Sequence, residues 1–168
     1  VIFNPGGKPV LELRTAIARV GLDFVRTLTI SFAVNQLRSA EALRGIEPQL
    51  HALWLRSVTV STHCFVIARR LARINADTAL LAGLLHGVGA LYIQTRAVTH
   101  PDLSSNPQAY AAVEREWEGS IARALLEGWR VTGTIVEAIG RLHRPERDTG
   151  GPAGLPEVLR AGVVLERA

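Results

Sequence analysis

The chain has 168 residues, of which 48% are hydrophobic and 20% charged, with a mean hydropathy of +0.18. This composition fits one compact domain and excludes intrinsically disordered and low-complexity classes, because it supplies enough apolar side chains to bury a core. Residues 1–100 carry 11 basic and 5 acidic side chains, whereas residues 101–168 carry 8 and 10. The net charge of +4 suggests an anionic partner without specifying one, and a solvated basic surface is the favoured explanation.

The cysteine content and the apolar runs of the sequence indicate in which cellular compartment the protein resides. A single cysteine, Cys64, excludes a disulfide scaffold and a cysteine-based zinc finger. No secretory leader is recognisable in residues 1–8, and apolar runs such as residues 79–85 are far shorter than the roughly 18 residues of a membrane span. We therefore expect a cytoplasmic protein without a membrane span. Because the sequence contains no Met, we also expect it to be a trimmed piece of a longer chain.

The first elements are a leader and a pair of helices. Residues 1–9 are rich in Gly and Pro and predict a loop. Apolar residues at helical spacing from Leu13 to Val20 predict a helix that Gly21 ends, and Asp23 can cap a second helix that extends to Leu37. We assign residues 10–46 to this helical pair and residues 47–168 to a helical core.

The segment from about residue 48 to residue 73 has the most regular helical pattern. One stripe repeats at alternating spacings of four and three residues and predicts a buried face, which comprises Leu50, Trp54, Ser57, Ser61, Cys64, Ala68 and Leu71. The residues in the middle of this stripe, Ser57, Ser61 and Cys64, have small side chains. We therefore expect either the close approach of another helix or room for a pocket.

A fourth helix follows, capped by Asn75 or Asp77. Its apolar residues are Leu80, Leu81, Leu84, Leu85 and Val88. Gly83, Gly87 and Gly89 fall within it or just after it, and each glycine costs about 1 kcal/mol relative to alanine inside a helix. Three glycines so close together predict tight packing or a helix break near His86.

The remaining segments also predict helices. Residues 100–107 predict a loop, and Asn106 followed by Pro107 is a good start for the next helix, which Gly128 ends. The predicted buried face of that helix comprises Tyr110, Val113, Trp117, Ile121 and Leu125. Further helices are predicted over residues 134–142 and 156–166, with a loop over residues 144–152. No alternating strand pattern competes, so we predict a single all-α domain.

Most short motifs have an ordinary structural explanation. Gly87 and Gly89 resemble half of a dinucleotide-binding fingerprint, but position 92 is Tyr where a third glycine is needed and no strand precedes them. Cys64 lies on the apolar stripe, which favours a buried structural thiol over a reactive one. The five histidines form neither a His-Glu-x-x-His motif nor an i, i+4 pair, so we predict no metal site and no cofactor. For His86, a hydrogen-bonded core residue is favoured over a ligand.

A family resemblance emerges from two runs. Leu-Trp-Leu-Arg-Ser at residues 53–57 and Leu-Ala-Gly-Leu-Leu-His-Gly-Val-Gly-Ala-Leu at residues 81–91 resemble the core of the HDOD family, whose members are related to the HD metal phosphohydrolases. Residues 16–22, 125–129 and 137–143 resemble other parts of the family pattern. The resemblance implies an HD-like helical bundle, and we expect the family's N-terminal helices to be missing from this chain.

The departures from the catalytic pattern bear on activity. The resemblance places Arg56 at the first metal-ligand position and His86 with Gly87 at the His-Asp pair. Arg stays protonated and Gly has no carboxylate, so neither can ligate a metal. The family's late His-His pair is reduced to Leu142 and His143, and residues 114–118 contain no His. For Arg56 an internal salt bridge is favoured over a bound anion or a partner contact. We add Arg69, Arg70, Arg73 and His143 as candidate anion or partner contacts.

The resemblance implies a non-catalytic module of bacterial signal transduction that contacts kinases, receiver domains or cyclic-di-GMP enzymes. On this interpretation Trp54, Trp117, Trp129 and the Leu-rich helices form a scaffold. A helix-turn-helix nucleic-acid regulator is the alternative, because Arg14, Arg19, Arg26 and Arg38 flank the Gly21 junction. We rank it second, since the second helix lacks an exposed run of base-reading side chains. A residual phosphohydrolase ranks last because of Arg56 and Gly87.

Overall fold

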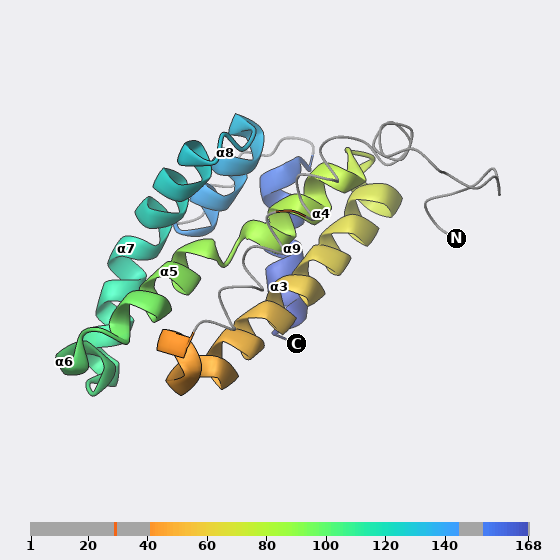
Figure 1. The fold of residues 1–168 in the computed structure, drawn as a ribbon. Helices are drawn as coiled ribbons and strands as arrows, with labels where there is room; N and C mark the ends of the chain where they lie inside the picture. The colour runs from red at the N-terminus through yellow and green to blue at the C-terminus, as the bar shows by residue number, and fades with distance from the viewer. Residues whose placement is uncertain (1–28, 30–40, 145–152, 168) are drawn as a thin grey trace, which may run out of the picture.

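The computed structural model describes residues 29, 41–144 and 153–167. Apart from residue 29, the expected leader and the two expected helices before residue 38 lie outside these ranges. The described elements follow in the order of Figure 1. They are the 3-10 helix η1 (Glu41–Ile46), α3 (Glu47–Ile67), the π-helical turn η2 (Ala68–Ala72), α4 (Ala76–Leu85), α5 (Val88–Ala97), α6 (Pro101–Ser104), α7 (Pro107–Gly128), α8 (Gly133–Leu142) and α9 (Leu155–Glu166). The described ranges contain no strand, so the all-α prediction is confirmed.

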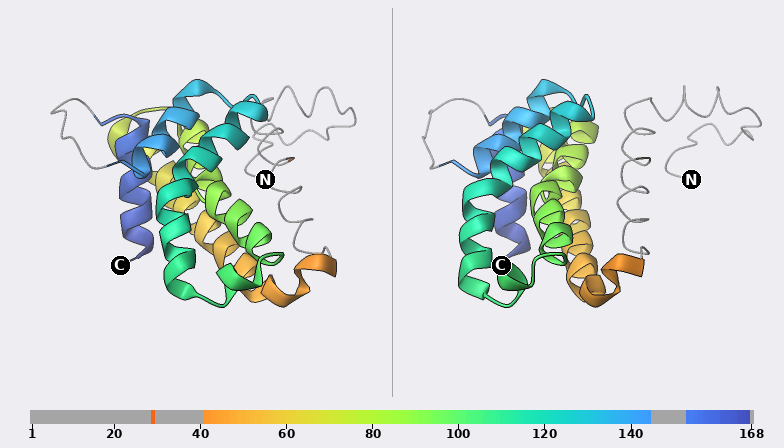
Figure 2. Two further views of the ribbon diagram at one scale, coloured as in Figure 1. Left: turned by 90° about the vertical axis from the view of Figure 1, so that its left-hand side faces the viewer. Right: turned by 60° about the vertical axis from the view of Figure 1, so that its left-hand side comes forward.

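The helices form a bundle around one aliphatic core. α4 and α5 follow one another along the bundle, with α3 on one side and α7 and α8 on the other (Figures 1 and 2). α9 packs against α3, α4 and α8. The largest fully buried side chains come from α3, α7, α8 and α9, and they include Leu50, Leu126, Ile135, Ile139 and Leu159. Helices from both ends of the described chain therefore share the same core.

The small residues in the middle of α3 allow two helix backbones to approach. A Cβ placed on Gly83 of α4 would stand 2.5 Å from the Cα of Ser61. A Cβ on Gly162 of α9 would stand 2.6 Å from the sulfur of Cys64. Both glycines lie where any side chain would collide with α3. The prediction of close helix approach on this stripe is therefore confirmed.

The predicted stripe fails at its last position. Leu71 is 78% exposed, although the helical spacing predicted it to be buried. The reason is η2, whose wider turn changes the angle between successive side chains after Ala68. Ala68 is the last residue of the stripe to be buried.

The break near His86 is present. α4 ends at Leu85 and α5 begins at Val88, with His86 and Gly87 between them. Asn75, rather than Asp77, caps α4, and its side chain accepts a hydrogen bond from the Thr78 amide at 2.9 Å. Asp77 lies in the first turn, where its charge favours the helix N-terminus.

The segment after α5 differs in two respects from the sequence prediction. Residues 101–104 form the short helix α6 within the expected loop, while Asn106 caps α7 as expected by accepting from the Gln108 and Ala109 amides. Trp117 is 51% exposed, and the buried residues of α7 are Ala122 and Leu126. Trp129 is also exposed and Trp54 is only half-buried. The tryptophans therefore do not form the scaffold that we expected.

Residues 76–97 are long and apolar enough, by length and composition, to resemble a membrane-spanning helix. They comprise α4, α5 and the break between them, and 67% of the apolar window is buried inside the bundle. The sequence prediction missed this window because it considered only uninterrupted apolar runs. Burial in the protein core accounts for its apolar composition.

Candidate functional site

Arg56 lies in the middle of α3 and forms an ion pair with the last residue of α9. Its Nε donates a hydrogen bond to Glu166 Oε2 at 3.0 Å, across 110 residues of sequence. The Arg56 side chain is 35% exposed and the Glu166 side chain 20%. The internal salt bridge is thus the state of Arg56 in this structure, and it connects the first long described helix to the last one.

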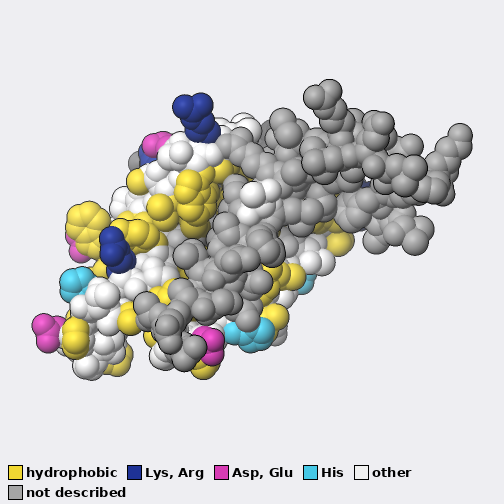
Figure 3. Space-filling view, viewed as in Figure 1, with side chains coloured by type: hydrophobic (Ala, Val, Ile, Leu, Met, Phe, Trp, Pro, Cys, Tyr) yellow, Lys and Arg dark blue, Asp and Glu magenta, His cyan; other side chains and the backbone are white. Residues whose placement is uncertain are grey.

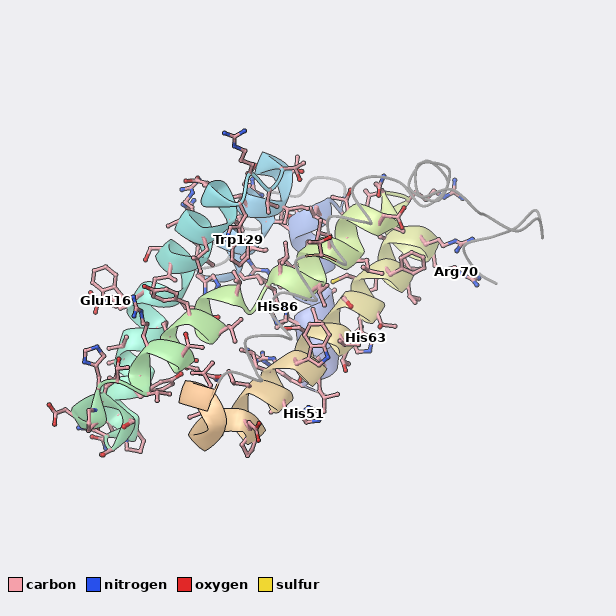
Figure 4. The ribbon with its side chains drawn as sticks, viewed as in Figure 1. His51, His63, Arg70, His86, Glu116 and Trp129 are labelled. Atoms are coloured by element: carbon pink, nitrogen blue, oxygen red, sulfur yellow. The ribbon has the colours of Figure 1, made fainter. Side chains whose placement is uncertain are left out.

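His86 is a buried, hydrogen-bonded residue at the α4–α5 break. Its Nδ1 lies 2.6 Å from the Gly83 carbonyl oxygen. Because a carbonyl can only accept, Nδ1 carries the proton and donates it to this bond. Burial lowers the pKa of His86, the nearby charges of Arg56 and His143 lower it further, and the Gly83 carbonyl and Glu166 oppose the shift. The ring is therefore neutral at pH 7 and lies near the Arg56–Glu166 pair, in the centre of the bundle in Figure 4.

Gly87 lies against α3. A Cβ on this residue would stand 3.1 Å from Leu53 Cδ1 and 3.4 Å from Ser57 Oγ. A carboxylate side chain here would require Leu53 to move. The space next to His86 is therefore occupied by α3 side chains.

Glu118 of α7 is a partly buried carboxylate on the other side of the break. The Ala90 amide, in the first turn of α5, donates a hydrogen bond to it. A Cβ on Gly89 would collide with the Glu118 carbonyl and stand 2.9 Å from its Cγ, so only glycine allows α7 this close. Burial raises the pKa of Glu118 to about 7, the Glu114 carboxylate adds to the shift, and Arg56, the Ala90 amide and Arg167 oppose it. Glu118 thus supplies the α5 N-terminus with the acceptor that Gly87 cannot offer.

His143 follows α8 and faces Glu118. Its Nδ1 lies 3.9 Å from Glu118 Oε2, and its side chain packs against Gly119, where a Cβ would stand 2.9 Å from the histidine Cβ. Burial lowers the pKa of His143. The two side chains therefore lie near each other, beyond hydrogen-bonding distance.

The structure brings together only some of the residues that the sequence singled out. Arg56, His86, Gly87 and His143 lie around one site. Arg69, Arg70 and Arg73 follow Arg56 by at least thirteen positions, about 20 Å along a helix, and Figure 4 places Arg70 at the far end of α3. These three arginines therefore form a separate group.

Sequence reasoning missed the two carboxylates of the site. Glu118 lies in a stretch where we looked only for a histidine, and Glu166 lies near the end of the chain outside any motif. Gly89 was the available signal for Glu118, because a glycine in the first turn of a helix indicates the close approach of another element. Glu166 had no local signal, since its partner is 110 residues away.

The residues of the site do not fit a metal ion. Arg56 has no lone pair to donate, Gly87 has no side chain, and the protonated Nδ1 of His86 is engaged with a carbonyl. Across residues 41–144 and 153–167, no group of three or more His, Cys, Asp or Glu side chains is placed to hold a metal. The arrangement is a neutralised polar cluster with one fixed cation, two carboxylates and two histidines.

The helical bundle and the residues at the α4–α5 break define an HD-like domain, and comparisons with known proteins agree. The HDOD domain model matches residues 5–145, so the chain belongs to the HDOD family. The fold is also similar to a crystal structure from Shewanella amazonensis SB2B, of a protein that carries the provisional name of metal-dependent phosphohydrolase.

That structural match has a TM-score of 0.69 and 23% sequence identity. It covers 97% of this chain and 60% of the other, so this chain spans about three fifths of the length of its neighbour. A comparison with curated protein sequences found no match.

Proposed function

We propose that this chain is a non-catalytic module of bacterial signal transduction that acts by protein–protein contact in the cytoplasm. The ion pair between Arg56 and Glu166 is the observation that carries the proposal. It places a permanent cation at the position where the resemblance to HD enzymes expects a metal ligand. A guanidinium cannot ligate a metal, and its positive charge disfavours a divalent ion next to it in a partly buried site.

The surroundings of Gly87 support the same conclusion. Metal-assisted hydrolysis needs a ligand set that binds the ion and leaves a position for water. At residue 87 a carboxylate is lacking, and Leu53 and Ser57 lie against the position that it would occupy. A domain that keeps this fold but lacks the metal ligands acts through the contacts that its surface makes with other proteins. Kinases, receiver domains and cyclic-di-GMP enzymes are the partner classes that the family resemblance implies.

A metal and activity assay tests the non-catalytic part. The purified chain is loaded with Mn²⁺ or Fe²⁺, desalted and analysed for bound metal, and is then assayed on p-nitrophenyl phosphate, a nucleoside triphosphate and cyclic-di-GMP. An active HD phosphohydrolase serves as the positive control. We expect metal well below one equivalent and no turnover above the Arg56→Ala variant. Stoichiometric metal together with turnover that depends on His86 would refute the proposal.

Binding measurements test the contact part. Candidate kinases, receivers and cyclic-di-GMP enzymes from the same genome are assayed against the full chain by two-hybrid analysis and then with purified proteins. We expect at least one direct complex with purified components. Failure of every candidate would contradict these partner classes.

A residual phosphohydrolase is the second candidate, and two observations favour it. The structural neighbour carries the provisional name of a metal-dependent phosphohydrolase. Glu118 and His143, two side chains that can exchange protons, also lie 3.9 Å apart. The assay above distinguishes this candidate. The nucleic-acid alternative rests on Arg14, Arg19 and Arg26, which lie outside the described residues, and no structural observation favours it.

A further inference from the structure

The end of α3 has an unusual backbone. η2 widens the last turn, and Arg73 follows in the left-handed conformation with φ of 52°. The Arg73 amide donates to the Ala68 carbonyl, as does the Ile74 amide at 3.3 Å. This position after a helix ordinarily favours glycine, because a Cβ is strained there. Arg73 therefore keeps a charged side chain at the cost of local stability. π-helical turns are also frequent at functional sites.

Two large aliphatic side chains lie in the same segment and face solvent. Leu71 is 78% exposed, more than any other large hydrophobic residue among those described, and Val66 is 51% exposed. The wider turn of η2 is what places Leu71 outside the core. Contiguous apolar patches with a polar rim are typical of interaction surfaces.

Three arginines lie within two positions of Leu71 in the chain. Arg69, Arg70 and Arg73 are exposed, and none of them forms an ion pair with a described residue. Arg69 instead lies over the ring of Phe65, 6.0 Å from its centroid. The next acidic residue along the chain, Asp77, pairs with none of them. By contrast, Arg56, Arg123 and Arg141 each have a carboxylate partner within the described chain.

We propose that Val66, Arg69, Arg70, Leu71 and Arg73, together the α3-end patch, dock an acidic segment of a partner protein that inserts one aliphatic or aromatic side chain against Leu71. This inference rests on the proposed function and locates the contact surface. Charge complementarity selects the occupant, because three cations without a described carboxylate favour an acidic ligand. The exposed Leu71 in the same segment favours a ligand that also offers an apolar side chain.

Nucleic acid and membrane fit the α3-end patch less well. The phosphate backbone of a nucleic acid offers charge but no apolar counterpart for Leu71. The patch also has no fully exposed aromatic side chain on which an unpaired base could stack. Recognition of anionic lipid typically uses clusters of four to eight basic residues, and this patch has three. Nucleic acid and anionic membranes are nonetheless included in the test as alternative ligands.

The experiment uses the full 168-residue chain. A displayed library of short random peptides is panned on it, and each recovered peptide is measured by fluorescence anisotropy. The patch variant carries Arg69→Ala, Arg70→Ala and Arg73→Ala, and a second variant carries Leu71→Ala alone. The matched control carries Arg96→Ala, Arg115→Ala and Arg123→Ala, which removes the same charge from exposed positions elsewhere. Circular dichroism verifies that all variants remain folded.

We expect the recovered peptides to be rich in Asp and Glu around one large apolar residue. Their affinity should fall at least about tenfold in the patch variant, fall in Leu71→Ala, and change by less than about twofold in the control. Peptides that bind patch variant and wild type equally, or a library that yields no patch-dependent binder, would overturn the proposal. So would tighter patch-dependent binding of random-sequence duplex DNA or of phosphatidylglycerol vesicles.

The result of the peptide experiment can be distinguished from the result of the tests of the proposed function. A failed peptide experiment with no metal-dependent turnover would leave a contact module that uses another surface. The exposed side chains of Tyr92 and Trp117, on α5 and α7, offer one. Figure 3 shows that hydrophobic side chains gather on the left-hand part of the described surface. Turnover in the metal assay would instead refute the non-catalytic function whatever the patch binds.

Discussion

Gly162 of α9 lies directly against the thiol of Cys64 on α3, where a Cβ would stand 2.6 Å from the sulfur and 3.3 Å from the Val60 carbonyl oxygen. The first and last long described helices are in contact because position 162 has no side chain. This contact lies beside the Arg56–Glu166 pair along the same two helices. The pair and the glycine together determine how α9 packs on α3.

Gly162→Ala should therefore destabilise the protein. The extra methyl group must displace a buried sulfur and a backbone carbonyl, and overpacking of this kind typically costs about 1–3 kcal/mol. Gly140→Ala in α8 is the matched control, since nothing lies within 4 Å of its Cβ position and alanine stabilises a helix by about 0.5–1 kcal/mol. Urea unfolding measures both. The double variant with Cys64→Ala should recover part of the loss, and a destabilisation equal to that of the single variant would show that the sulfur is not the obstacle.

Removing one partner of the Arg56–Glu166 pair should destabilise more than removing both. Arg56→Met leaves Glu166 partly buried and unpaired, so we expect a loss of about 1 kcal/mol, a value kept low because both side chains retain solvent contact. A double-mutant cycle with Glu166→Gln gives the coupling energy. The exposed Arg123–Glu127 pair is the control and should couple by no more than about 0.5 kcal/mol. Equal coupling in the two cycles would contradict a special role for Arg56.

Glu118→Gln should stabilise the protein in a pH-dependent way. The pKa of Glu118 is raised from its ordinary 4.5 to about 7, so the fold disfavours the ionised form. The contribution of Glu118 to the stability of the wild type therefore falls as pH rises from about 4.5 to about 7, and the cost is fully present above that range. At pH 8 the variant should be more stable by at most about 3 kcal/mol, and near pH 4 the difference should vanish. Gln also retains an oxygen to accept from the Ala90 amide.

Urea unfolding at both pH values checks this prediction, with Glu116→Gln as the control, because Glu116 is an exposed neighbour on α7. The control should leave stability nearly unchanged at both values. A stabilisation by Glu118→Gln of the same size at pH 4 and pH 8 would mean that ionisation of Glu118 is not its cause.

The Cys64 thiol should be unreactive in the native protein. Burial raises its pKa to about 12, so the reactive thiolate is scarce at pH 8, and the side chain is fully buried as well. We expect modification by Ellman's reagent to be at least about a thousandfold slower than in urea-unfolded protein. Its rate should follow the opening of the α3–α9 contact, so Gly162→Ala should accelerate it. Rapid labelling of the folded wild type would contradict the burial of Cys64.

Arg73→Gly should stabilise the protein by about 0.5–1 kcal/mol, because glycine adopts the left-handed conformation without strain. Thermal unfolding measures the gain. The same substitution should weaken binding of any acidic peptide that the α3-end patch selects. A loss of stability would show that the Arg73 side chain makes contacts that offset its backbone strain.

Local physics made much of this fold predictable. Asn75 and Asn106 cap helices because a side-chain oxygen next to the first free amides stabilises a helix start, whatever surrounds it. The helix break near His86 followed from three clustered glycines. The HDOD resemblance was visible in the sequence because it depends on residues that are adjacent in the chain and form short motifs.

Tertiary structure alone decided the exposure of Leu71 and Trp117 and the composition of the site. A π-helical turn shifts the register of the stripe, and ideal helical spacing cannot anticipate that shift. Glu118 reaches the Ala90 amide, and Glu166 reaches Arg56, only because α7 and α9 pack against the α3–α5 layer through Gly89 and Gly162. Sequence thus determined where helices begin and end, since those signals act within a few residues. The pairing of charges across 110 residues depends on how whole helices pack, and only the folded bundle decides it.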